Sequence, residues 1–237
     1  MKKRFKIAAL LVFMFLVNSA GAQKILFGAG GGYATFSMSD LKDYNTTVQN
    51  NLPFSPEVTD NFPAWFYLNA DVLYSFPRLV AAGLTVSTTS TGSRLHLADY
   101  SGEYSFDMQT HGWFPGVKVL LGKAPGRTNG PCFSLEGGMA FSSMSFDEKI
   151  AVYEEETNDQ QDFSAHGFFV KPGLTYMYHV GNQLIVSANV SYYRGFESGY
   201  YVKGNSGQKI TNTDTGKRIK PNWNGLRAGL VLYWGKE

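Results

Sequence analysis

Residues 65–76, WFYLNADVLYSF, place an apolar side chain at every second position. The apolar positions run from Phe66 to Phe76, and the positions between them include Asn69, Asp71 and Ser75. A period of two is the signature of a β-strand whose two faces differ, whereas a helix repeats its apolar face every three to four residues. The stretch therefore predicts one strand with an apolar face.

The same alternation recurs along the chain and predicts an all-β fold of eight strands. They are expected at 25–38, 63–76, 79–88, 109–121, 132–146, 164–179, 183–194 and 222–234. Beyond residue 23, no apolar run reaches the roughly 20 residues that a membrane-spanning helix needs. If this chain crosses a membrane, it must do so with strands.

Short and long connections alternate between these strands. The short ones are 77–78, 122–131 and 180–182, and the long ones are 39–62, 89–108, 147–163 and 195–221. This order predicts an antiparallel up-and-down meander with every long loop at one end. Soluble domains seldom carry several long loops, but outer-membrane barrels combine short periplasmic turns with long extracellular loops.

The first long loop is expected to hold a short helix. Ser39 is a suitable N-cap, and Leu41, Tyr44 and Val48 would share one face of the helix. We interpret this segment as a lid at the rim of the barrel.

The N-terminus has the pattern of an export signal. A basic start, which includes Lys2 and Arg4, precedes the apolar run 7–17, and Ala20-Gly21-Ala22 offers a cleavage site. The sequence predicts a cleaved signal peptide at 1–22 and one barrel domain at 23–237. The whole chain has 21 basic and 19 acidic residues, and the signal holds four basic and no acidic ones. The mature chain therefore carries 17 basic and 19 acidic residues.

Composition excludes several classes of function. Cys132 is the single cysteine, which excludes an intrachain disulfide framework and a multi-cysteine zinc site. The net charge is too small to suggest a nucleic-acid partner. The glycines of GAGGG, 28–32, lie inside an expected strand and open no helix, so they do not form a dinucleotide-binding loop. No cofactor is predicted.

The two strand faces indicate which side meets lipid. A soluble barrel would cover its exterior with Lys and Glu, whereas the non-apolar face here is mostly Gly, Ser, Thr and Asn, which suits a crowded interior. The apolar face should then point outward, with outer-membrane lipid as its partner and aromatic residues at both interfaces. The periplasmic belt is predicted to hold Tyr74, Phe76, Tyr176, Tyr178 and Trp234, and the outer one Phe66, Phe141 and Tyr192.

Three stretches, GAGGGYATFS (28–37), GVKVLLGK (116–123) and LRAGLVLYWG (226–235), carry a family resemblance. With the export signal, they resemble small outer-membrane β-barrel proteins of Bacteroidetes, the porin-like family that includes PorT. The architecture is similar to outer-membrane protein X and the membrane domain of outer-membrane protein A. The resemblance implies location in the outer membrane, insertion by the assembly machinery and, for a PorT-like member, a role in protein secretion. Many such barrels end on an aromatic residue, whereas here Trp234 is followed by three more residues.

Five charged residues are expected to point into the barrel. They are Asp71, Lys118, Glu136, Lys171 and Arg227. Isolated charges there would be costly, so they should pair or reach water. We interpret them as a structural plug that closes the lumen, because eight strands leave no open channel. An ion path or gate is the alternative.

The later loops carry opposite charges. The acidic loop 147–163 and the basic loop 195–221 would lie at one rim and either stay solvated or contact each other. Its charge makes the acidic loop a candidate calcium site, but the loop shows no EF-hand spacing.

The most direct functional hypothesis is a non-enzymatic barrel that acts through surface loops or envelope partners. One alternative is a PorT-like accessory component of a secretion system. The other is an enzyme acting on lipid A, in which the outward residues Ser143, His111 and His166 would supply a nucleophile and a base near the outer rim.

Overall fold

The computed structural model describes residues 24–54, 56–76, 80–100, 102–122, 129–152, 155–181, 183–213 and 215–235. The predicted signal peptide, 1–22, and most of the three predicted short turns lie outside these residues. Where the last of those turns begins, Gly181 adopts φ 70°, a left-handed conformation that glycine accepts without strain.

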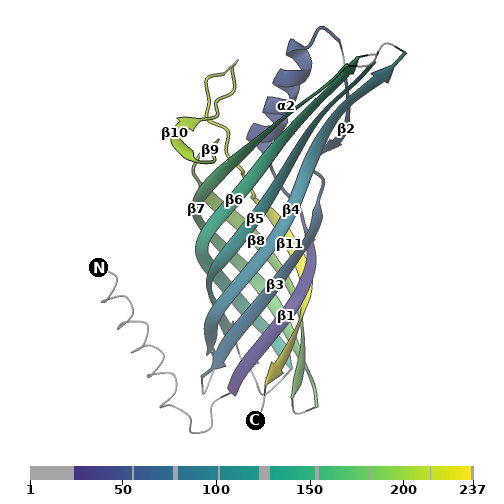
Figure 1. Cartoon of the computed structure of the whole chain (residues 1–237). Helices are drawn as coiled ribbons and strands as arrows, with labels where there is room; N and C mark the ends of the chain where they lie inside the picture. Colours follow the sequence, from purple (N-terminus) through teal and green to yellow (C-terminus); the bar gives the residue numbers. More distant parts are fainter. Residues whose placement is uncertain are drawn as a thin grey trace.

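Eight long antiparallel strands form a closed ring (Figure 1). In chain order, which is also their order around the ring, they are β1 (Lys24–Ala34), β3 (Trp65–Ser75), β4 (Val80–Asp99), β5 (Gly102–Gly122), β6 (Gly130–Val152), β7 (Glu155–Val180), β8 (Leu184–Glu197) and β11 (Gly225–Gly235). The ring closes where β11 pairs with β1, from Gly235 opposite Leu26 to Arg227 opposite Ala34. The predicted eight-stranded up-and-down barrel is confirmed.

Four neighbouring strands are much longer than the sequence indicated. β4 to β7 have 20, 21, 23 and 26 residues, whereas the other four have 11 to 14. The prediction of long loops at 89–108 and 147–163 is therefore wrong, because most of both segments is strand. Their outward positions turn polar beyond the apolar band, and this change hides the alternation that identified the rest of each strand.

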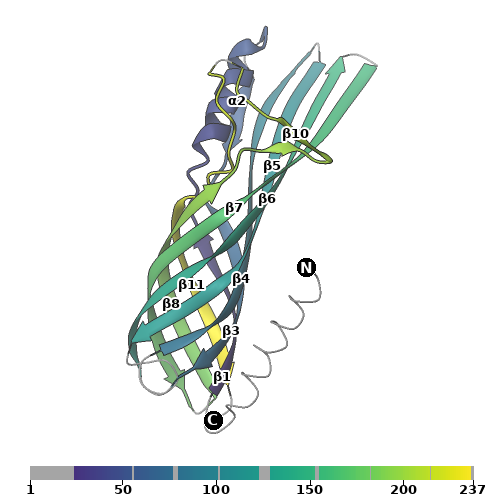
Figure 2. The ribbon, with the colours of Figure 1, turned by 90° about the vertical axis from the view of Figure 1, so that its left-hand side faces the viewer.

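The remaining elements gather at the end of the ring where β4 to β7 project (Figures 1 and 2). They are the helix α2 (Ser39–Asn51) and the strands β2 (Glu57–Asn61), β9 (Tyr201–Val202) and β10 (Asn205–Lys209). β2 pairs with β4, and β9 pairs with both β7 and β10. We call these elements, with the projecting parts of β4 to β7, the cap, and the opposite end of the ring the turn end.

The helix α2 covers the inner face of the projecting strands. Leu41 is fully buried, and Tyr44 and Val48 pack against the same apolar cluster, as the helical spacing predicted. The Tyr44 ring stacks on Phe146 of β6 at 5.6 Å between centroids. The prediction that Ser39 caps the helix is wrong. The N-cap is Met38, and its backbone N–H donates to the Asn222 carbonyl at 3.1 Å.

The outward face of the ring is apolar. Phe66, Leu68, Leu84 and Leu174 are each more than 60% exposed, and their strands alternate them with buried residues. The inward position of Asp71, 2% exposed, shows that the predicted strand faces are correct. An exterior of this kind is that of a transmembrane β-barrel. Within the described part of the chain, no helix is long and apolar enough to cross a membrane.

Candidate functional site

The interior of the barrel is filled in layers. Nearest the turn end lies an apolar layer that includes Leu26, Leu73, Leu120 and Met177, all fully buried or nearly so. A charged layer comes next, and a larger apolar cluster that continues into the cap lies above it. The charged layer is the part that the sequence singled out.

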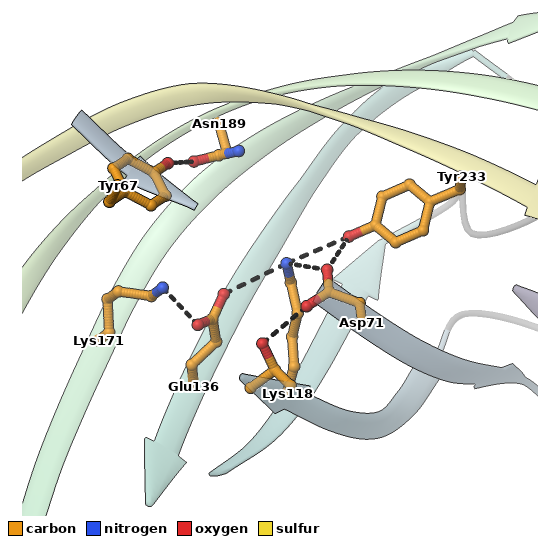
Figure 3. A network of polar contacts seen from close by, with 8 residues as sticks. Tyr67, Asp71, Lys118, Glu136, Lys171, Asn189 and Tyr233 are labelled. Atoms are coloured by element: carbon orange, nitrogen blue, oxygen red, sulfur yellow. Dashed lines mark hydrogen bonds and ion pairs between the residues drawn. The ribbon is translucent and has the colours of Figure 1, made fainter. Parts of the chain in front are cut away.

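Four of the five predicted interior charges form one chain of ion pairs (Figure 3). The strand register places Lys118 opposite Glu136, and Glu136 opposite Lys171. Lys118 Nζ lies 2.9 Å from Asp71 Oδ2 and 3.2 Å from Glu136 Oε1, and Lys171 Nζ contacts Glu136 Oε2. The charges therefore alternate in sign across four strands, and each carboxylate has at least one cation beside it.

Two further side chains complete the Asp71 end of the charge chain. The Thr85 hydroxyl donates to Asp71 Oδ1 at 2.7 Å, and the Tyr233 hydroxyl donates to Asp71 Oδ2 at 2.6 Å. Lys118 Nζ also donates to the Tyr233 hydroxyl at 3.1 Å. Gly28 makes room for this arrangement, since a Cβ there would overlap the Tyr233 ring. The alternation predicted that the charged residues point inward. It did not single out Thr85 or Tyr233, because neither side chain is charged.

Arg227, the fifth predicted charge, is held differently. It is 1% exposed and makes no ion pair with the other four. Its guanidinium carbon lies 4.2 Å from the Tyr193 ring centroid, 4.9 Å from that of Phe114 and 5.8 Å from that of Tyr67. Aromatic faces attract cations, and this contact replaces an acidic partner. Within the described residues, none of its three nitrogens has a hydrogen-bond partner.

Glu197 is an interior acid that sequence reasoning missed. It ends β8, is 8% exposed and accepts a hydrogen bond from the Tyr193 hydroxyl at 3.1 Å. The predicted strand 183–194 ends before Glu197, which therefore falls in the predicted loop 195–221. Inward-facing positions recur at every second residue, so continuing them from Tyr193 to 195 and 197 places Glu197 inside the barrel. With the five predicted charges, it gives three acidic and three basic side chains among the buried charged residues that the structure describes.

The predicted aromatic belts lie on the outward face. Phe76, Tyr176, Tyr178 and Trp234 are exposed near the turn end, where Tyr74 packs edge-on against Phe76 at 4.7 Å. Toward the cap, the exposed aromatic residues include the predicted Phe66, Phe141 and Tyr192.

A pocket of about 510 Å³ opens on the outward face toward the cap, across β5, β6 and β7. It brings together all three residues of the predicted enzyme alternative, His111, Ser143 and His166. The hydroxyl of Thr110 donates to the Ser143 carbonyl at 3.3 Å, and the His166 backbone N–H donates to Ser198 Oγ at 3.3 Å. No hydrogen bond between described residues joins the Ser143 hydroxyl to either imidazole.

Within the described residues, the predicted acidic segment 147–163 contacts the basic segment 195–221 around Asp162, where the Lys203 backbone N–H donates to the Asp162 carbonyl at 3.0 Å and Phe163 pairs with Val202. Lys203 Nζ lies 3.6 Å from Asp162 Oδ2, and both side chains are largely exposed. Among the residues whose placement is described, no group of three or more His, Cys, Asp or Glu side chains could hold a metal ion.

No protein family matches the chain, and no curated protein matches it. Among solved structures, the chain is similar to a major outer membrane protein from Thermus thermophilus, with 14% identity and a TM-score of 0.48 over 91% of this chain and 100% of that one. Ail, the attachment invasion locus protein of Yersinia pestis, gives 10% identity and a TM-score of 0.32 over 90% of this chain and 95% of Ail. Its complex with the heparin analogue sucrose octasulfate gives 10% and 0.34 over the same shares. Values this low carry no argument about kinship, so the assignment of a transmembrane barrel rests on the strand register and the exterior of this chain.

Proposed function

We propose that this chain is an outer-membrane barrel that is not an enzyme, whose interior is a structural plug and whose cap contacts partners in the cell envelope. The observation that carries the proposal is the contrast between the two faces of the ring. Outward residues are apolar and exposed, whereas the interior charges are buried and mostly paired.

The height of the apolar band supports a membrane position. On β7 the outward apolar row runs from Phe168 to Val180, about 40 Å of strand at roughly 3.3 Å per residue. Tilted by about 40°, as in transmembrane barrels, this row spans about 30 Å, the thickness of the hydrocarbon core. Bacterial barrels of this type reside in the outer membrane, to which the export signal predicted at 1–22 would deliver the chain.

The filled interior supports a closed barrel. Trp223, Arg227, Tyr193 and Tyr233 rank among the largest fully buried side chains, and all four project into the ring or its mouth. Since eight strands enclose little more than the volume of their own side chains, we expect no path for solutes.

The projecting strands supply a contact surface for partners. The segment from Glu155 to Gln161 of β7 pairs with β6 on one side and, within the described residues, with no strand on the other. A free strand edge presents backbone donors and acceptors that a partner segment can pair with. The exposed Asp159 adds negative charge, which favours a basic partner segment.

Fractionation tests the membrane position. We expect the protein in the outer-membrane fraction, and we expect the folded form in detergent to migrate differently on a gel before and after boiling. Recovery in the soluble periplasmic fraction would contradict the proposal. Crosslinking followed by purification in mild detergent tests the partner role, and recovery of the barrel alone counts against it.

A PorT-like role in protein secretion is a finer version of the same proposal. Gene deletion with profiling of secreted proteins separates the two, since unchanged secretion would leave only the general envelope role.

Catalysis on lipid A is a second candidate, favoured by the pocket that gathers His111, Ser143 and His166. A nucleophile and its base must lie within hydrogen-bond reach, and here the Ser143 hydroxyl is joined to neither imidazole. We therefore rank catalysis below the non-enzymatic role. Lipid A that is chemically unchanged after deletion of the gene would exclude it.

A further inference from the structure

The pocket across β5, β6 and β7 divides by chemistry along the membrane normal. We call it the rim pocket. On the side of the apolar band it is lined by Trp113, Pro115 and Phe141. On the cap side it presents the polar residues His111, Ser143, Ser164, His166 and Tyr201. One pocket thus offers an apolar wall and a group of hydrogen-bond donors.

This division coincides with the edge of the membrane band. On each of the three strands, the last outward aromatic residue is followed, one outward position nearer the cap, by a polar one. The steps are Trp113 to His111, Phe141 to Ser143 and Phe168 to His166. The rim pocket therefore lies where acyl chains end and headgroups begin, continuous with the lipid-facing surface.

The polar side of the rim pocket is not occupied by internal contacts. Among the described residues, neither imidazole of His111 and His166 has a hydrogen-bond partner. The His166 ring only packs edge-on against Tyr201, at 6.0 Å between centroids. Imidazole N–H and hydroxyl groups that converge on one space, with no nearby carboxylate lining it, suit a phosphate oxygen.

A second pocket of about 340 Å³ shares His111 and extends from it over β4 and β5. Trp65, Asp60 and Gln109 line it, together with the Arg94–Asp107 ion pair, in which Arg94 Nε lies 2.6 Å from the carboxylate. An aromatic ring beside several fixed polar groups suits a sugar. The polar part of the ligand can therefore be larger than a phosphate and carbohydrate in nature.

We propose that the rim pocket binds a phosphorylated glycolipid of the outer leaflet. The acyl chain lies against Trp113 and Phe141, the phosphate accepts hydrogen bonds from His111 and His166, and the sugar extends toward Trp65. This inference rests on the membrane position proposed above, but it requires no chemical step.

The test measures binding of diphosphoryl lipid A to the purified full chain in detergent by native mass spectrometry. We expect His111→Leu combined with His166→Leu, which removes both hydrogen-bond donors, to weaken binding about tenfold or more, the usual loss for hydrogen bonds to a charged group. The matched control is His96→Leu, which removes a half-buried histidine that lies outside the pocket and contacts Glu103 at 3.4 Å. Phe141→Ala should also weaken binding, whereas Phe133→Ala, on the same outward row of β6, should not.

Two comparisons identify the source of the phosphate. Phosphatidylglycerol should bind more weakly than lipid A because it has no sugar to reach Trp65, and millimolar inorganic phosphate should not displace lipid A. Binding that is equal for wild type and the double histidine variant would overturn the proposal, as would displacement by inorganic phosphate alone. In either case a normal boiling-dependent gel shift would leave the barrel assignment standing, so the two failures are distinguishable.

Discussion

Glu136 connects the interior charge chain, because each of its carboxylate oxygens contacts a different lysine. It is 6% exposed, so water cannot replace either contact. Removing one member of a buried charge group leaves its partners uncompensated, which costs more than the whole group contributes.

Glu136→Gln should therefore destabilise the barrel by about 3–5 kcal/mol. Unfolding in urea, followed by tryptophan fluorescence on protein inserted in liposomes, measures the free energy. The control is Asp107→Asn, which makes the same chemical change in the exposed pair with Arg94 and should cost less than about 1 kcal/mol. Equal costs for the two variants would show that the interior charges reach water.

Gly28 also stabilises the charge chain, and its role is steric. Gly28→Ala places a methyl group against the Tyr233 ring and should displace its hydroxyl from Asp71, at a cost of about 1–3 kcal/mol in the same unfolding measurement. Gly137→Ala is the control, because its added Cβ would meet only ordinary van der Waals contact, 3.5 Å from the Phe169 carbonyl. If both variants unfold alike, Tyr233 does not depend on the space at Gly28.

At the scale of elements, the alternation of apolar and polar residues predicted the strands only within the membrane band, where the outward positions face lipid. Inside the membrane band the outward positions contact lipid and are therefore apolar. Apolar residues at every second position, such as Phe66 and Leu68, identify a strand there. In the projecting part of β4 the outward positions are polar, such as Ser90 and Arg94, while Leu95 still points inward. In this part of β4 the inward residues are buried against a helix and loops that are distant in the sequence. A local sequence pattern does not report such contacts.

The candidate site shows the same limit. Parity placed the four paired charges and gathered His111, Ser143 and His166 on one face. It did not supply Glu197, which lies past the expected end of a strand, or the aromatic contacts of Arg227, which come from three other strands. Contacts across the interior depend on the tilt of the strands and the diameter of the barrel. The sequence of a single strand specifies neither quantity.

We expect three tyrosines to make the cap sensitive to alkaline pH. Burial is the main cause that raises the pKa of Tyr44, Tyr104 and Tyr200 above the ordinary value, and Glu148 adds to it for the first two. Because the folded cap holds these protons more tightly than the unfolded chain, its stability should be complete below about pH 10 and fall as pH rises further.

Absorbance at 295 nm, which reports tyrosinate, and protease sensitivity of the cap measure this loss. Tyr200→Phe removes one titrating group and should shift the transition to higher pH. Tyr100→Phe, a change at a fully exposed tyrosine, should not. Ionisation of all tyrosines near pH 10 without opening of the cap would contradict the expectation.

At the scale of the whole molecule, the filled layers predict a barrel that does not conduct. Reconstituted in planar bilayers, the protein should give no single-channel steps, because the apolar layer at the turn end and the charged layer above it block the same path. Reproducible steps of one size would show that the plug opens. A larger porin with an open aqueous lumen, reconstituted in the same way, is the positive control.

The unequal lengths of the strands make the two flanks of the barrel differ in height. The tall wall of β4 to β7 rises on one flank, and the opposite flank of β8, β11, β1 and β3 ends low (Figure 2). Neighbours that drift in the plane of the membrane would therefore meet a different profile on each flank.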